Sequence, residues 1–83
     1  MKRFLATAVS LALLAAPALA EPSCKGSGAT MPMWQVAKHF EDAGGSISQM
    51  KTTNGCYEIY GHENDRRVEA FFDPRSGNEL ARE

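Results

Sequence analysis

Two cysteines and two histidines are the residues of this chain whose types could do covalent chemistry. Cys56 with His39 or His62 would supply a nucleophile and a base, the pair that thiol catalysis requires. A cysteine held in a disulfide has no thiolate to attack with, and a structural disulfide between Cys24 and Cys56 is the stronger interpretation. The sequence contains no glycine-rich phosphate loop, no H-E-x-x-H and no C-x-x-C motif. We therefore predict that the protein is not an enzyme.

Metal binding is the second chemistry to weigh. His39 and His62 could join methionines in a copper site, but the methionines fall at core-like positions and their spacing follows no known ligand pattern. The acidic turn Glu63-Asn64-Asp65 could contact Ca²⁺, but it lacks the D-x-D-x-D-G loop and its distal Glu. We predict surface histidines, a solvated turn, and neither a metal nor a cofactor.

The first twenty residues have the pattern of a secretory signal peptide. A basic start precedes a mostly apolar run over residues 4–16, and Ala18-Leu19-Ala20 forms a small-x-small cleavage box. The apolar run is shorter than the ~20 residues that a membrane helix needs. We predict cleavage between Ala20 and Glu21, no stable membrane anchor afterwards, and a periplasmic or secreted location.

Residues 21–83 leave room for a single small domain, which we expect to be monomeric. Because the leader removes Lys2 and Arg3 but no acidic residue, the formal net charge falls from −1 to −3. That balance argues against nucleic acid or an anionic membrane surface as the main partner.

A disulfide is the expected source of stability for so short a domain. A core of this size gives little margin over chain entropy, and an exported chain meets an oxidising compartment. Joining Cys24 to Cys56 closes a loop of about 33 residues, which contributes roughly 3.5 to 4 kcal/mol in the chain-entropy model. The stretch over residues 21–30, rich in Gly and Ser, then becomes an extended arm held by Cys24.

Residues 33–43 have the apolar spacing of one amphipathic helix. Pro32 suits the start of a helix, and Gly44-Gly45 suits its end. One stripe of the helix should pack on a sheet; it consists of Met33, Val36, Ala37 and Phe40. Trp34 does not fit this stripe, so it either covers the arm near the helix start or stands partly exposed, and local packing is favoured over a binding role for it.

The pair Asn54-Gly55 between two strand-like runs predicts a type I′ hairpin turn, because both residues tolerate positive φ. Residues 50–53 should therefore pair antiparallel with residues 56–59. This register sets Thr52 opposite Tyr57 and Met50 opposite Ile59, on the face that the helix covers.

A third strand follows over residues 66–73, where apolar and polar side chains alternate. A polar loop, residues 62–65, should join it to the preceding strand. The turn Asp73-Pro74-Arg75-Ser76-Gly77 reverses the chain again, and residues 79–82 form a short edge strand. The predicted fold is α+β, with one helix on an antiparallel sheet of three to four strands and an N-terminal arm tied by the disulfide.

Alternation also predicts the side of the sheet that the helix does not cover. Its side chains are Lys51, Glu58, Tyr60, Glu69 and Phe71. We expect them to form an aromatic and charged patch in water, because nothing else in so short a chain can cover them fully. Exposed aromatics among charges suit a protein partner, although a peptide could instead extend a free sheet edge.

Several of these features together resemble one protein family. They are an exported leader, an early Cys, a short helix that contains Trp34 and ends in Gly, and then the motifs GCYEIY and VEAFFDPRSG at this spacing. This combination resembles the small exported proteins of the PepSY domain family over roughly residues 33–78. The turn at residues 63–66 departs from the Asp-Gly turn that many relatives carry.

The resemblance implies a function as well as a fold. The family is associated with the propeptides of secreted metallopeptidases, so it implies a noncatalytic domain that binds and inhibits a protein partner, such as a peptidase, in the periplasm. Two alternatives stay open from the residues themselves. One is a small ligand- or metal-binding envelope protein, and the other is a structural envelope protein without a dedicated ligand.

Overall fold

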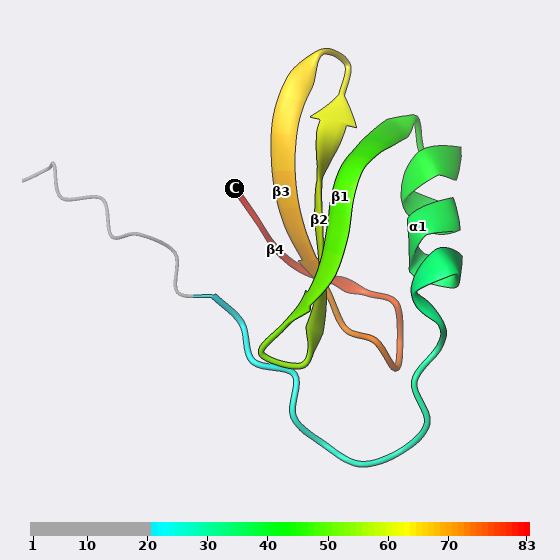
Figure 1. Cartoon of the computed structure of the whole chain (residues 1–83), viewed down its shortest axis with the longest axis vertical. Coiled ribbons are helices and arrows are strands. Elements are labelled where there is room, and N and C mark those ends of the chain that lie inside the picture. Colours follow the sequence, from blue (N-terminus) through cyan, green and yellow to red (C-terminus); the bar gives the residue numbers. More distant parts are fainter. Residues whose placement is uncertain (1–20) are drawn as a thin grey trace, which may run out of the picture.

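The computed structural model describes residues 21–83 and shows one helix packed on a four-stranded antiparallel sheet (Figure 1). The elements are α1 (Met33–Asp42), β1 (Gly45–Thr53), β2 (Cys56–Glu63), β3 (Arg66–Phe72) and β4 (Glu79–Arg82). The strands keep chain order across the sheet, so each strand pairs with the next. The predicted α+β fold is confirmed. The predicted signal peptide with its cleavage box, residues 1–20, lies outside the described residues.

The helix α1 begins and ends where its flanking residues predict. Pro32 is extended, with φ −67° and ψ 153°, and the chain turns helical directly after it. Gly44 has a φ of 104°, a conformation in which glycine has no steric penalty, and the helix ends before it. The side chains of Val36 and Phe40 are buried against the sheet. Figure 1 shows α1 lying alongside β1.

The first hairpin has the predicted turn and register. Asn54 and Gly55 have φ values of 52° and 80°, as a type I′ turn requires. Met50 pairs with Ile59 and Thr52 with Tyr57, so the register predicted from Asn54-Gly55 is confirmed. The pairing shifts between Ile47 and Gln49, which leaves one extra residue, Ser48, in β1.

The second turn is tighter than the predicted polar loop. His62 and Glu63 belong to β2 and pair with Arg67 and Arg66, so the loop of residues 62–65 shrinks to two residues. Asn64 and Asp65 adopt φ values of 51° and 68°. Both are positive, and Asn and Asp are the non-glycine residues that enter this region most readily. A two-residue turn therefore forms here without glycine.

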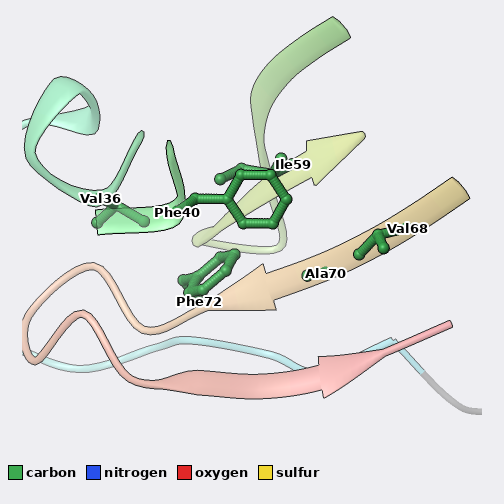
Figure 2. Close-up of a cluster of buried hydrophobic side chains, with 6 residues drawn as sticks. All are labelled: Val36, Phe40, Ile59, Val68, Ala70 and Phe72. Atoms are coloured by element: carbon green, nitrogen blue, oxygen red, sulfur yellow. The ribbon is translucent and has the colours of Figure 1, made fainter. Parts of the chain in front are cut away.

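The main hydrophobic core lies between α1 and the sheet (Figure 2). Its rings meet edge to face, because the centroids of Phe40 and Phe72 lie 6.4 Å apart at an interplanar angle of 85°. The buried members of this cluster are Val36, Phe40, Ile59, Val68, Ala70 and Phe72. The predicted inward alternation of β2 and β3 is thus confirmed on this side.

Two glycines allow the close approach of α1 to the sheet. A Cβ atom placed on Gly45 would overlap the ring of Phe40, and one placed on Gly61 would overlap the carbonyl oxygen of Ser46. Side chains at these positions would push β1 away from its neighbours. Gly45 and Gly61 therefore fix how deeply Phe40 enters the core.

Candidate functional site

The side of the sheet turned away from α1, called the open face below, carries the five residues predicted to bind a partner. One row of paired residues runs through Lys51, Glu58 and Phe71 to Ala81, since each pairs with the next across the four strands. The neighbouring row contains Tyr60 paired with Glu69, with Gln49 opposite Tyr60 in β1. The register therefore brings all five onto one face.

The structure corrects the prediction that this whole patch lies in water. Phe71 and Glu58 are each only 1% exposed, so neither side chain is available to a partner. Lys51 is exposed, and Tyr60 and Glu69 are half-buried. The open face is therefore divided into a buried end, with Phe71 and Glu58, and an accessible end beyond them.

The N-terminal arm is tied to the buried end of the open face. Cys24 is bonded to Cys56, and its backbone nitrogen donates to the carbonyl oxygen of Asn54 at 2.9 Å. Both cysteines are buried, and Cys56 lies on the open face two residues before Glu58. The predicted disulfide is confirmed, and it ties the arm to the end of the open face at which Glu58 lies.

The arm is held at further points after the disulfide. The guanidinium of Arg75 donates to the carbonyl oxygen of Gly26 at 2.8 Å and to that of Ser27 at 3.1 Å. The Met31 nitrogen then donates to the Pro74 carbonyl at 2.8 Å, and the Tyr57 hydroxyl donates to the Met31 carbonyl at 2.6 Å. The arm thus crosses the end of the sheet from the open face to α1. The sequence predicts the attachment of the arm at Cys24, but it carries no signal for these contacts with the arm backbone.

Glu58 is the one charged side chain among the buried residues of the described chain. Its Oε1 atom accepts a hydrogen bond of 2.6 Å from the Thr53 hydroxyl. Burial opposes ionisation of this carboxyl, but hydrogen bonding with Glu69, Thr53 and Tyr60 and the charge of Lys51 outweigh it and lower the pKa of Glu58. Glu58 therefore carries a negative charge beneath the face.

Tyr60 links the buried end to the accessible end. The ammonium nitrogen of Lys51 lies 5.5 Å from the centroid of the Tyr60 ring, within the range of a cation–π contact. Hydrogen bonding to Glu58, with burial and the negative charges of Glu58 and Glu69, raises the pKa of Tyr60 to about 12. The phenol is therefore neutral at ordinary pH and available as a hydrogen-bond donor.

The accessible end of the open face is hollowed. The hollow has a volume of about 510 Å³. Its lining residues are Ser48, Gln49, Tyr60, Gly61, His62, Arg67, Val68, Glu69 and Glu83. Most of these residues are polar and both signs of charge occur, while the surface that they present to the hollow is mainly apolar, so the hollow suits a partly apolar side chain of a protein partner.

Trp34 on α1 is a second feature that bears on partner binding. The side chain is 65% exposed on α1, so it does not find the local packing favoured for it. Its position outside the apolar stripe was the available signal, because a residue off the stripe of a single helix on a sheet faces solvent. A Trp left in water is a second candidate for contact with a partner.

The residues weighed for catalysis and metal binding do not come together. Cys56 is bonded to Cys24, so it offers no thiolate, and His39 and His62 are exposed. Within residues 21–83, no group of three or more His, Cys, Asp or Glu side chains is placed to hold a metal ion. The described helix is too short to cross a membrane.

The chain matches the model of one known family. The peptidase propeptide and YPEB domain family matches residues 4–83. The chain belongs to this family. Such PepSY domains are generally noncatalytic, are associated with peptidase propeptides and their regulation, and are typical of exported proteins. Neither a curated protein nor a solved structure matches the chain.

Proposed function

We propose that this PepSY domain is exported and binds and inhibits a peptidase in the periplasm, without catalytic activity of its own. Membership in the peptidase propeptide family over residues 4–83 is the observation that carries the proposal. The disulfide between Cys24 and Cys56 adds support, because structural disulfides persist in oxidising compartments. Cleavage between Ala20 and Glu21 by signal peptidase belongs to the same proposal.

The accessible end of the open face is the contact surface that we propose. Tyr60 provides a half-buried aromatic ring, and Tyr is enriched among residues that dominate binding energy. Lys51 and Glu69 stand beside it with opposite charges, and the adjoining hollow can receive a side chain of the partner. Phe71 and Glu58 are withdrawn as contact residues because they are buried.

The test is inhibition of an exported peptidase. The protein is expressed from the full chain, recovered from the exported fraction, and added in increasing amounts to the exported peptidases of the producing organism with a fluorogenic peptide substrate. We expect saturable inhibition that weakens at least tenfold in Tyr60→Ala, because truncating an aromatic hot-spot residue costs about 2 kcal/mol or more and ~1.4 kcal/mol is tenfold.

Trp34→Ala is the comparison variant, since it removes the exposed aromatic of the other candidate surface, on α1. It should inhibit as the unmodified protein does, and both variants should retain the native melting temperature. Absence of inhibition at a large excess of unmodified protein would contradict the function. Full inhibition by Tyr60→Ala with loss in Trp34→Ala would move the contact surface from the sheet to α1.

A further inference from the structure

The buried carboxyl of Glu58 has one oxygen without a hydrogen-bond donor. The residue is 1% exposed, Oε1 is satisfied by the Thr53 hydroxyl, and Oε2 has no partner within the described chain. A buried acceptor left without a donor is unfavourable by about 1 to 3 kcal/mol, and by more when it is charged. Folded proteins satisfy nearly all such groups, so a donor for Oε2 has to be found.

The groups that face Glu58 come from three strands of the sheet, and Glu83 lies behind one of them. Thr53 and Lys51 approach from β1, Tyr60 from β2, and Glu69 from β3, while Glu83 follows β4 and pairs its backbone with Glu69. Glu69 is the diagonal neighbour of Glu58, because Glu58 pairs with Phe71 and Glu69 pairs with Tyr60. Long side chains in diagonal positions reach one another. The register therefore makes the two carboxyl groups neighbours on the open face.

The other neighbours leave Oε2 to Glu69. The hydroxyl hydrogen of Thr53 is used on Oε1, and the Tyr60 hydroxyl forms no hydrogen bond with Oε2. The ammonium of Lys51 lies over the Tyr60 ring in water. An ionised carboxylate only accepts hydrogen bonds, so two ionised groups cannot satisfy each other and also repel. A single proton on Glu69 supplies the missing donor, because the protonated carboxyl can donate to Oε2. It also removes the repulsion, because the second negative charge disappears.

We propose that Glu58 and Glu69 form a proton-binding site in which Glu69 keeps one proton and donates it to Glu58, so that the domain loses stability as the pH rises and this proton leaves. The proposal stands apart from the peptidase function. Hydrogen bonding to Glu58, burial, and the charges of Glu58 and Glu83 raise the pKa of Glu69, in agreement with it. Because Glu69 lines the hollow, release of the proton also adds a negative charge there.

The sign of the pH dependence follows from the two carboxyls. Glu69 has a folded pKa above its ordinary value of 4.5, so its contribution is complete below pH 4.5 and is lost as the pH rises through the raised value. Glu58 has a lowered pKa, so its contribution is present above pH 4.5 and is lost as the pH falls through the lowered value. Stability from the pair is therefore greatest between these two pKa values, where it holds one proton.

The test is a carboxyl-carbon NMR titration of the ¹³C-labelled exported protein, combined with denaturant unfolding across the same pH range. We expect the Glu69 carboxyl to titrate above the ordinary glutamate value and the Glu58 signal to respond in the same step. In Glu69→Gln the side-chain amide donates to Oε2 without a titrating proton. This variant should lose the fall in stability with rising pH, while Glu41→Gln, an exposed change on α1, should keep it.

Titration of Glu69 at the ordinary value would overturn the proposal, as would a Glu69→Gln variant whose stability falls with pH as steeply as that of the unmodified protein. The NMR readout uses the unmodified chain, so it decides the matter even if Glu69→Gln folds poorly.

Discussion

The two faces of the sheet are buried by different means. On the helix side, α1 covers the apolar residues of β2 and β3, and the core there is continuous. On the open face, burial ends between two adjacent rows, since Phe71 is 1% exposed whereas Tyr60, in the next row, is half-buried. The difference teaches that alternation decides which face a side chain points to, while the chain outside the sheet decides whether that side chain meets water.

The stabilising interactions differ in the same way. Burial of apolar area, at about 25 cal/mol per Å², dominates beneath α1. The buried end of the open face depends on the arm, which the Cys24–Cys56 bond and the Arg75 contacts hold in place. A domain of about 60 residues buries only about 60% of its unfolded surface, so such a cross-link is needed. Substitutions at the arm and in the sheet separate these two sources of stability, apolar burial and cross-linking.

Removal of the disulfide should lower the stability of the domain most. Cys24 and Cys56 are separated by 32 residues, and their bond contributes roughly 3.5 to 4 kcal/mol in the chain-entropy model. We expect the Cys24→Ser, Cys56→Ser double variant to melt more than ten degrees below the unmodified protein in a calorimetric scan, because ~1 kcal/mol shifts a domain of this size by about 4 to 8 °C. A melting temperature within a few degrees would mean that the arm stays in place without its bond.

Tyr57→Phe should lower the stability of the domain moderately. The Tyr57 hydroxyl donates to the Met31 carbonyl at 2.6 Å and joins the arm to the helix side of the sheet. Loss of one such bond should lower the unfolding free energy by about 0.5 to 1.5 kcal/mol in urea denaturation, with the same slope against urea. Tyr57→Phe as stable as the unmodified protein would show that this end of the arm does not depend on the bond.

Arg82→Met should lower the stability of the domain least, and it should do so only above acidic pH. Arg82 contacts Glu63 at 2.6 Å and Glu79 at 2.8 Å, but its side chain is 38% exposed, so solvent and salt screen these pairs. The hydrogen bond to Arg82 lowers the pKa of Glu63 below 4.5, so its contribution is present above that pH and is lost as the pH falls through the lowered value.

Melting curves of Arg82→Met and the unmodified protein should therefore differ slightly at neutral pH and converge at low pH or in high salt. A difference that persists in both conditions would point to packing of the Arg82 stem instead of charge.

The sequence predicted the local elements well because their signals are local. Asn54-Gly55 specified the first turn and its register, and Pro32 and Gly44 marked the ends of α1. The pairing of Cys24 with Cys56 followed from compartment and size, since no other cysteine is available. The turn at Asn64-Asp65 was harder, because neither residue is glycine and both adopt positive φ.

The division of the open face could not be predicted from alternation. Phe71 and Glu69 are equivalent in the pattern, but Phe71 lies toward the end of the sheet to which the arm is tied through contacts far apart in sequence. The shared carboxyl site depends on the same long-range geometry, since burial of Glu58 is set by its neighbours in other strands. The exposure of Trp34 could be anticipated only from its place outside the helix stripe.

Chemical denaturation of Phe71→Ala and Tyr60→Ala, measured side by side with Phe72→Ala, tests the division of the open face most directly. The account predicts that Phe71→Ala loses about 3 to 5 kcal/mol, as much as Phe72→Ala in the core beneath α1, because both rings are buried. Tyr60→Ala should lose far less than either. A Phe71→Ala variant that is nearly as stable as the unmodified protein, or a Tyr60→Ala variant that unfolds as readily as Phe72→Ala, would contradict it.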